Sequence, residues 1–360
     1  LMRCGAGYSL ILPQDGVFSG ALAGLAGKLT GVRVVCIDHG NLSFFTRRDS
    51  RVYHAERIAM VATMHWPRIV RLLARGLLVF YWPSLYLLAR IAARFIDHYL
   101  IPGVEGDSVD EGCKLLRINP SRITRYGSMI DIHHHVVPDP VSRANIREQK
   151  GIASDAIVVA IVCRLAPEKG LDIALAGISR ALARLSSEQR ARVRVVIAGN
   201  GPLRKQVEEA IYHFSLGQYC LLWGELSADE VITLLGISDI FLYTSMRGAC
   251  MAMAVLEAMA SGCAVIASTE PLSNAVLLSE GRGIALPAGD IEQTSLALVR
   301  LLNDVELCHR MGKLARDYIA LHHSPEMFRR TLLRATYWSG LAELLGAEKK
   351  IETVGIGSES

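Results

Sequence analysis

A strand that is apolar at every position constrains the fold of this chain more than any other segment. Residues 157–163 have the sequence IVVAIVC, and no polar side chain precedes Arg164. Strands of this kind are covered on both faces, as in parallel sheets, whereas a half-exposed strand alternates apolar with polar residues. Ligands of open α/β sheets bind beyond the carboxyl ends of such strands. Arg164 and Lys169 follow this strand directly, and two cations in this place suit a diphosphate.

Apolar strands and helical segments alternate regularly from this strand onward. We expect strands at 157–163, 193–198, 219–223, 239–243, 263–267 and 283–286, and helices at 170–185, 202–214, 228–235, 250–261, 272–279 and 291–303. This alternation is typical of a doubly wound parallel sheet.

The first part of the chain shows the same order of elements over a shorter length. We expect strands at 9–12, 33–37, 95–102 and 121–131, with helices at 19–29 and across 56–94. The polar residues 133–150 contain two prolines and form the predicted linker. The predicted domains are a partial N-terminal Rossmann-like domain at 1–140, a C-terminal Rossmann-like domain at 141–304, a helical segment at 305–345 and a polar tail at 346–360.

The composition favours a folded globular protein and gives no support to nucleic-acid binding. Of the 360 residues, 51% are apolar and 21% are charged, which is enough for two buried cores. The net charge is only +4, and Lys and Arg form no polybasic tract. Eight cysteines without a CxxC pair suit reduced, buried thiols in a cytoplasmic protein. The opening residues do not have the pattern of a cleavable signal.

The most lipophilic stretch, residues 68–100, is too interrupted to cross a bilayer as one helix. Pro83 divides the apolar run between Arg75 and Arg90, and a spanning helix needs about 20 apolar residues. Two interpretations stay open. The stretch forms a core-facing helix pair, or its arginines and neighbouring tryptophans place an amphipathic surface in peripheral contact with the inner face of a membrane.

Two motifs together resemble the nucleotide-sugar-binding half of GT-B glycosyltransferases. RLxxxKG begins at Arg164, and LEAMAxG begins at Leu256. The resemblance is to the retaining family-4 type, also called glycosyl transferases group 1. It implies two Rossmann-like, doubly wound α/β domains that face a cleft, with the first domain incomplete here. It also implies transfer of a hexosyl group, without a metal, from a UDP- or GDP-linked sugar to a saccharide or lipid-linked saccharide in surface glycan biosynthesis. The nucleotide sugar is a co-substrate, and no cofactor is expected.

The resemblance assigns roles to the donor-binding residues. Arg164 and Lys169 would neutralise the departing diphosphate, and Glu257 would accept hydrogen bonds from the ribose hydroxyls. The residue pattern also favours a site at Glu257, because an ionised carboxylate among Ala, Met, Val and Leu needs a partner or a cleft. The other predicted donor-binding residues are Gly199, Gly201, Gly248, Ala249, Cys250 and Met251. The turn at 199–201 is also explained as a tight turn before a helix that Pro202 begins.

One position departs from the family pattern. The family has another glutamate eight positions before the one that matches Glu257, in a loop that touches the transferred sugar. In this chain that position is Ala249. In the first domain, His39 matches the family histidine that orients the donor sugar, and Asp15 and Gly127 are weaker cleft candidates. The consecutive histidines 133–135 are interpreted as linker residues, since their spacing does not bring three nitrogens onto one metal.

Two rival hypotheses stay open, and the missing front of the first domain supports one of them. The family begins with a strand and a Gly-rich loop that this chain lacks, which suggests a truncated gene model or a shortened protein. With Ala249, this observation supports a catalytically inactive, GT-B-like binding or scaffold protein. The other rival is a sugar-nucleotide epimerase of the same architecture, which would interconvert donors without an acceptor.

Overall fold

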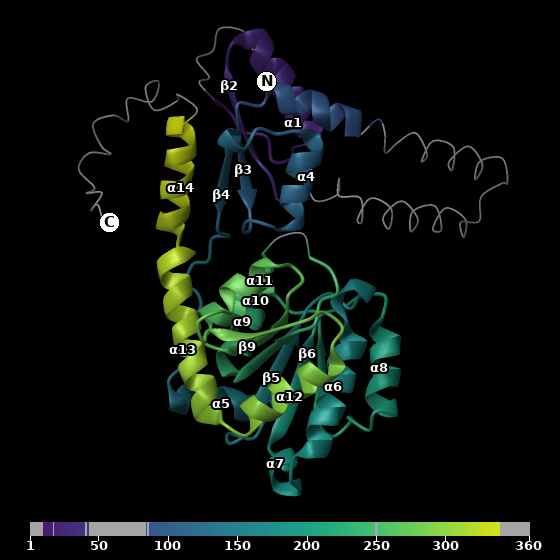
Figure 1. Ribbon diagram of the computed structural model, residues 1–360. Coiled ribbons are helices and arrows are strands. Elements are labelled where there is room, and N and C mark those ends of the chain that lie inside the picture. The colour runs from purple at the N-terminus through teal and green to yellow at the C-terminus, as the bar shows by residue number, and fades with distance from the viewer. Residues whose placement is uncertain are drawn as a thin grey trace, which may run out of the picture. The chain divides into compact units, whose positions relative to one another are not determined.

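The computed structural model describes residues 10–16, 18–39, 42, 84, 86–248 and 251–338 (Figure 1). The described residues fall into two compact units. The first unit combines the residues before Gly127 with those after Met327, and the second unit is continuous from Gly127 to Met327. The chain therefore leaves the first unit once and returns to it in its last described helix.

The first unit is built on a four-stranded parallel sheet. Its strand order is β1-β2-β3-β4, with β1 at Leu10–Ile11, β2 at Arg33–Ile37, β3 at His98–Pro102 and β4 at Ile123–Tyr126. The helices are α1 at Phe18–Thr30 and α4 at Ser108–Leu116, and residues 86–95 are also helical. The strands predicted near these positions are confirmed, although β3 and β4 are shorter than expected.

The second unit contains a six-stranded parallel sheet with the order β10-β9-β8-β5-β6-β7. The strands are β5 at Ile157–Val162, β6 at Val193–Ala198, β7 at Cys220–Gly224, β8 at Ile240–Tyr243, β9 at Ala264–Ser268 and β10 at Gly283–Leu286. The order reverses between β5 and β8, as in doubly wound folds. The predicted alternation of strands and helices is confirmed.

Helices connect these strands and cover the sheet. They are α5 at Pro140–Gln149, α6 at Leu171–Arg184, α7 at Ser187–Ala191, α8 at Arg204–His213, α9 at Ala228–Ile237, α10 at Met253–Ala260, α11 at Ser273–Leu277, α12 at Ile291–Leu302, α13 at Val305–His322 and α14 at Pro325–Trp338. In Figure 1, α9 and α10 lie on one side of the sheet and α6 and α8 on the other.

Strand β5 contributes to a hydrophobic core on each face of its sheet. Val159 and Ile161 pack in the core that α6 and α12 complete. Val158 and Ala160, one residue out of phase, pack in the core that α9 and α10 complete. Because neighbouring side chains of a strand point to opposite faces, a strand buried on both faces must be apolar throughout. This arrangement confirms the interpretation of β5 as a fully covered strand.

The segment predicted as a linker is partly helical. Its residues 140–149 form α5, which begins at Pro140 after Asp139, whose carboxylate accepts hydrogen bonds from the backbone N–H groups of Val141 and Ser142 at 3.0 and 3.1 Å. Pro at the first helical position and Asp before it are strong helix-start signals. Helix α5 belongs to the second unit, whereas the assignment of domains at 1–140 and 141–304 stays a prediction.

The C-terminal residues 305–338 are helical, as predicted, and their last helix returns to the first sheet. Phe328 and Leu332 of α14 pack on the core formed by Val35, Leu100 and Tyr126. The rings of Phe328 and Tyr126 meet edge to face, with centroids 5.5 Å apart. The predicted tail at 346–360 and residues 43–83, which include residues 68–83 of the lipophilic stretch, lie outside the described residues.

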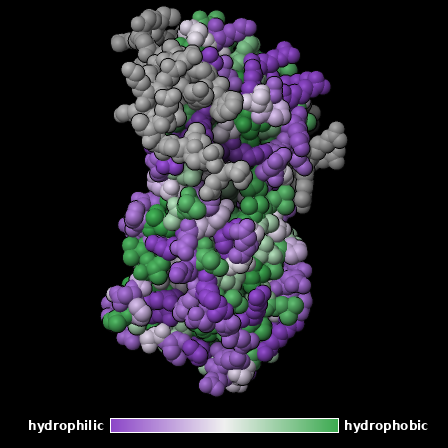
Figure 2. All heavy atoms as spheres, turned by 60° about the vertical axis from the view of Figure 1, so that its left-hand side comes forward, coloured by the Kyte–Doolittle hydropathy of each residue, from purple (hydrophilic) through white to green (hydrophobic). Residues whose placement is uncertain are grey.

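Among the described helices, none is long and apolar enough to cross a membrane. The face of the second unit seen in Figure 2 carries hydrophobic residues scattered among hydrophilic ones.

Candidate functional site

The turn after β5 presents two cations at the carboxyl end of the sheet. Arg164 follows the strand directly, and Lys169 ends a short 3-10 helix at Pro167–Lys169. The Arg164 side chain is 68% exposed, and its Nη2 donates to Glu168 Oε1 at 2.5 Å. Lys169 Nζ lies 5.8 Å from the centroid of the Tyr243 ring. Among the described residues, no carboxylate lies within ion-pairing distance of Lys169.

Glu168 is held in its ionised form at this turn. Partial burial alone raises the pKa of a carboxyl group. Hydrogen bonding to its own backbone N–H and to Arg164 outweighs this, so the pKa of Glu168 lies below its ordinary value. A carboxylate and two cations therefore stand within six residues of one another.

A glycine lets the loop after β8 close on this turn. Gly170 has a φ of +60°, and a Cβ added there would lie 2.2 Å from the carbonyl oxygen of Thr244. Thr244 Oγ1 donates to the carbonyl oxygen of Gly170 at 2.8 Å. Both the backbone conformation and the close approach require glycine. The loop that carries Lys169 is therefore fixed by contacts from a strand neighbouring β5.

Further hydrogen bonds join the loops after β5, β8 and β9. The backbone N–H of Met246 and the hydroxyl of Ser245 both donate to the carbonyl oxygen of Glu168, at 2.8 and 2.9 Å. Ser268 Oγ donates to the carbonyl oxygen of Ser245 at 2.6 Å, and Asn274 Nδ2 donates to that of Ser268 at 2.9 Å. Since Ser245, Ser268 and Asn274 are buried, this chain of bonds is shielded from water and rigid.

The turn at 199–201 lies against the turn after β5. A Cβ at Gly199, where φ is +133°, would lie 1.9 Å from the carbonyl oxygen of Cys163. The backbone N–H of Leu165 donates to the carbonyl oxygen of Asn200 at 2.9 Å. A Cβ at Gly201 would lie 2.4 Å from the carbonyl oxygen of Leu165. Both glycines thus serve close backbone packing beside Arg164.

The predicted donor-binding residues after β8 are only partly described. Gly248 is in close contact with the loop after β9, since a Cβ there would lie 2.4 Å from Pro271 Cδ. Ala249 and Cys250 lie outside the described residues, and Met251 precedes α10 and is half-buried. Helix α10 therefore begins close to this end of the sheet.

Glu257 lies in α10 among buried neighbours. Val255, Leu256 and Ala258 are fully buried, and burial raises the pKa of Glu257 above its ordinary value. Among the described residues, no donor forms a hydrogen bond or an ion pair with its carboxylate. A half-buried carboxylate in this state is costly and has its full capacity to accept hydrogen bonds from a ligand.

The two candidates in the first unit are engaged with their own surroundings. His39 follows β2, and its ring nitrogens lie 3.0 Å from Gln14 Oε1 and 3.4 Å from the Tyr126 hydroxyl. Asp15 accepts a hydrogen bond from the backbone N–H of Ser19 at 3.2 Å in the first turn of α1. This contact ties Asp15 to the first turn of α1.

Gly127, the second of the two weaker candidates, lies at the start of the second unit. A Cβ at Gly127 would lie 2.9 Å from ring atoms of His323. The His323 ring is buried, and burial lowers its pKa. Its Nδ1 lies 3.0 Å from the carbonyl oxygen of Ser128. A small residue at 127 therefore allows His323 to pack on the chain.

Residues 142–318 match a family model described as Glycosyl transferases group 1. These residues, just under half of the chain, therefore form a group 1 glycosyltransferase domain. The matched range contains β5 to β10, and with them the RLxxxKG and LEAMAxG motifs, so the group 1 domain coincides with the part of the chain where the sequence pattern is strongest.

Curated relatives and solved structures agree with this assignment. Lipopolysaccharide 1,2-N-acetylglucosaminetransferase from Salmonella typhimurium is 30% identical over 131 residues, which are 34% of this chain and 33% of that protein. The GDP-mannose-dependent alpha-(1-6)-phosphatidylinositol monomannoside mannosyltransferase from Mycolicibacterium smegmatis is 26% identical over 190 residues, 50% of this chain and 47% of that protein. The chain thus spans between a third and about half of the length of these relatives.

The structure of Alr3699/HepE from Anabaena, in complex with UDP, superposes with a TM-score of 0.69 at 15% identity. The match covers 94% of this chain and 79% of HepE. Together with the two parallel sheets, it shows that the predicted GT-B fold is correct.

Some residues that build the site were missed in the sequence. Thr244, Ser245 and Ser268 hold the loops of the group 1 domain together, and each lies at or after the end of a buried strand. The sequence did contain a signal for them, because small hydroxyl residues stand at the ends of two strands that are neighbours in the sheet. Their partners are distant in the sequence, because Thr244 and Gly170 are 74 residues apart.

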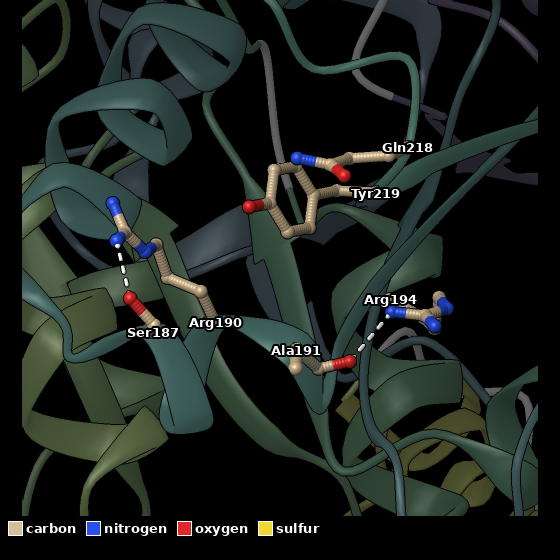
Figure 3. Close-up of a pocket in the computed structure, with 6 residues that line it drawn as sticks. All are labelled: Ser187, Arg190, Ala191, Arg194, Gln218 and Tyr219. Carbon is tan, nitrogen blue, oxygen red and sulfur yellow. Dashed lines mark hydrogen bonds between the residues drawn. The ribbon is translucent and has the colours of Figure 1, made fainter.

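A hollow of about 590 Å³ lies at the opposite edge of the group 1 domain. It is lined by residues of α7, of the start of β6 and of the turn before β7, which are Ser187, Arg190, Ala191, Arg194, Gln218 and Tyr219 (Figure 3). Arg190 donates to Ser187 Oγ at 3.1 Å, and Arg194 donates to the carbonyl oxygen of Ala191 at 2.9 Å. This hollow contains no residue of the predicted site.

The consecutive histidines have separate partners. His134 Nε2 lies 3.1 Å from Asp229 Oδ1, and His135 Nδ1 lies 3.1 Å from Ser261 Oγ. Burial, followed by the neighbouring His134, lowers the pKa of His135. In the part of the chain that the structure describes, no cluster of His, Cys, Asp and Glu is arranged to hold a metal ion.

Proposed function

We propose that this chain transfers a hexosyl group from a nucleotide sugar to a saccharide or lipid-linked saccharide in surface glycan biosynthesis. The observation that carries the proposal is the turn after β5, where Arg164 and Lys169 stand beyond the carboxyl end of a central strand. The turn is hydrogen-bonded to the loop after β8. Ligands of doubly wound sheets bind at this edge, next to the point where the strand order reverses.

The leaving nucleoside diphosphate is the group that the two cations would stabilise. Cations that are already in place where negative charge develops lower the barrier of a transfer reaction. Arg164 and Lys169 supply that charge in the proposal, so that the reaction needs no metal. Retention of the anomeric configuration follows from the family resemblance and is part of the proposal.

The remaining predicted residues would surround the rest of the donor. Glu257 would accept hydrogen bonds from the ribose hydroxyls, which supplies the partner that its carboxylate lacks among the described residues. Backbone N–H groups at Gly248, Ala249, Cys250 and Met251 would bind phosphate or sugar oxygens. The turn with Gly199 and Gly201 would border the nucleotide.

The first domain would contribute the acceptor side. His39 would orient the donor sugar, and Asp15 and Gly127 are weaker candidates for residues of the cleft. The acceptor domain would comprise residues 1–140 and the donor domain residues 141–304, followed by a helical segment to 345. The acceptor classes come from the names of the relatives, one of which acts on lipopolysaccharide and one on a phosphatidylinositol mannoside.

The base of the donor is uridine or guanosine in this proposal. HepE was solved with UDP, and the Mycolicibacterium relative depends on GDP-mannose. With acceptors of these classes, the protein would work in the cytoplasm, with peripheral contact at the inner face of a membrane. This contact would involve the lipophilic stretch at 68–100.

Thermal unfolding with UDP, GDP and ADP, each added separately, tests the donor site. A nucleotide at 100 times its dissociation constant adds about 2.7 kcal/mol of stability. We expect one nucleotide to raise the melting temperature, and the shift to disappear in Arg164→Ala and Lys169→Ala. Release of that nucleoside diphosphate from a panel of nucleotide sugars with saccharide acceptors then separates an enzyme from an inactive binding protein. Binding without turnover would favour the inactive alternative, and absence of binding would contradict both.

A further inference from the structure

Arg164 is the more exposed of the two cations, and its exposure is a problem for a site that binds a diphosphate. With 68% of its side chain exposed, Arg164 would sample many rotamers in water if it had no partner. Fixing a side chain of this length at a ligand reduces the binding free energy, because the side chain loses rotamer freedom. A residue that restricts Arg164 in the free protein would remove part of this cost.

Glu168 is placed to restrict it. Its Oε1 accepts a hydrogen bond from Nη2 of Arg164 at 2.5 Å, across the turn that both residues flank. A guanidinium group has five N–H donors in a planar fork. One contact with Glu168 therefore leaves donors of the fork available to phosphate oxygens. The lowered pKa of Glu168 keeps the contact charged at neutral pH.

The backbone of the turn does not depend on this side chain. The carbonyl oxygen of Glu168 is held by Ser245 and Met246, and that of Gly170 is held by Thr244. An exposed ion pair contributes little to the free energy of unfolding. Truncation of the Glu168 side chain should therefore leave the loop in place and change only the freedom of Arg164.

We infer that Glu168 is a positioning residue for the diphosphate site, which acts by holding the Arg164 guanidinium in its binding orientation. The inference rests on the proposed function. It differs from a structural role, in which Glu168 would stabilise the loop whether or not Arg164 is present. It also differs from competition, in which Glu168 would withhold Arg164 from the diphosphate.

A double-mutant cycle on the affinity for UDP and GDP distinguishes these roles. By isothermal titration, Glu168→Ala should weaken binding about three- to tenfold, Glu168→Gln should weaken it less, and Glu168→Ala should have no further effect in an Arg164→Ala background. Equal losses in both backgrounds would indicate a structural role and overturn the inference, and tighter binding in Glu168→Ala would indicate competition and also overturn it. Glu208→Ala is the matched control, because Arg204 and Glu208 form an exposed pair of the same spacing at 3.0 Å.

A measurement without nucleotide keeps this inference separate from the proposed function. The ¹⁵N relaxation of the Arg164 Nε–H group should report a restricted side chain in the wild type and a mobile one in Glu168→Ala, with no change in Glu208→Ala. Equal mobility of Arg164 in all three proteins would contradict the inference, even if nucleotides bind. If no nucleotide binds while Arg164 is restricted by Glu168, the proposed function fails and the positioning contact stands.

Discussion

The two edges of the second sheet differ in how far their charged residues are paired. At the amino edge, where β5 and β8 begin, Arg147 is 5% exposed and Asp239 is 7% exposed. Arg147 donates to Asp239 at 2.9 Å and to backbone carbonyls of Ala156 and Ile237, and Asp239 also accepts from Arg143. At the carboxyl edge, where the loops after β5, β6, β8 and β9 meet, Arg164 pairs with Glu168 at the surface, whereas Lys169 has no carboxylate within ion-pairing distance among the described residues. Glu257, in the helix α10 that follows the loop after β8, also has no charged partner among them.

This difference in pairing distinguishes residues that maintain the fold from residues that are available to bind a ligand. A buried ion pair with all its hydrogen bonds made is stable because each charge compensates the other, and removal of one partner leaves an uncompensated charge. Charges that are left unpaired in an otherwise well-bonded edge are candidates for function. The variants below test whether stability and nucleotide affinity divide between the two edges in this way.

Arg147→Ala should have the largest effect on stability. It leaves Asp239 buried without its main partner, and we expect the free energy of unfolding to fall by about 3 to 5 kcal/mol. Urea unfolding measures this fall. Arg192→Ala is the control, since Arg192 pairs with Asp155 at 3.6 Å on the surface and should cost less than about 1 kcal/mol. If the two variants were equally stable, the amino edge would not have the structural role assigned to it.

Gly170→Ala should lower both stability and nucleotide affinity, because the loops after β5 and β8 pack against each other closely only with glycine at this position. The added Cβ meets the carbonyl oxygen of Thr244 at 2.2 Å in a left-handed conformation, and we expect a loss of about 2 to 3 kcal/mol. Nucleotide affinity should fall as well, since Lys169 shifts with the loop. Gly217→Ala is the matched variant, because no atom lies within 4 Å of a Cβ there. Unchanged unfolding of Gly170→Ala would show that the loop closes in another way.

Lys169→Ala should lower nucleotide affinity and leave stability almost unchanged. The side chain is half-buried at the edge and forms no ion pair with a described residue, so the free energy of unfolding should change by less than about 0.5 kcal/mol. Loss of a hydrogen bond to a charged phosphate costs about 1.5 to 3 kcal/mol, and nucleotide affinity should therefore fall about 10- to 100-fold. Titration calorimetry measures this change, with Lys205→Ala as the control on α8. A large loss of stability with unchanged affinity would reverse the assignment.

Glu257→Gln should raise stability slightly while it weakens nucleotide binding. Burial raises the pKa of Glu257 in the folded state, so the folded state binds its proton more tightly than the unfolded state does. The contribution of this group to stability is therefore present below the unfolded pKa of about 4.3 and is lost as the pH rises through the folded pKa.

A neutral glutamine avoids that loss. The variant should be more stable than the wild type at pH 7.5, by less than about 1 kcal/mol, and the gain should vanish near pH 4. Thermal unfolding at both pH values, with and without nucleotide, checks the sign. A variant that is less stable at pH 7.5 would show that Glu257 has a stabilising partner in the free protein.

The contrast between the edges explains what could be predicted from the sequence. Strand β5 was predicted because burial on both faces imposes a continuous apolar run, and Arg164 and Lys169 were found because they follow it directly. Arg147 was interpreted as part of a polar linker, since nothing near it indicates that it is buried. Its partner Asp239 is 92 residues away, and such pairing is decided by tertiary packing.

Glu168 shows the same limit within the site. Its place between two cations was visible, but its ion pair with Arg164 depends on the conformation of the turn, which Thr244, Ser245 and Met246 fix from another strand. Short-range patterns therefore predicted which strand ends carry the chemistry. The hydrogen bonds between loops, which set the orientation of each side chain, became visible only in the structure.

Hydrogen–deuterium exchange with and without saturating UDP or GDP tests the central claim most directly. Backbone N–H groups that are ordered by a ligand exchange more slowly. We predict protection in peptides that cover residues 163–170, 199–203 and 244–248, and unchanged exchange in peptides that cover residues 143–156 and 187–194. Protection at the amino edge, or at the hollow with Arg190 and Arg194, would contradict the account, and so would a saturating nucleotide that protects neither edge.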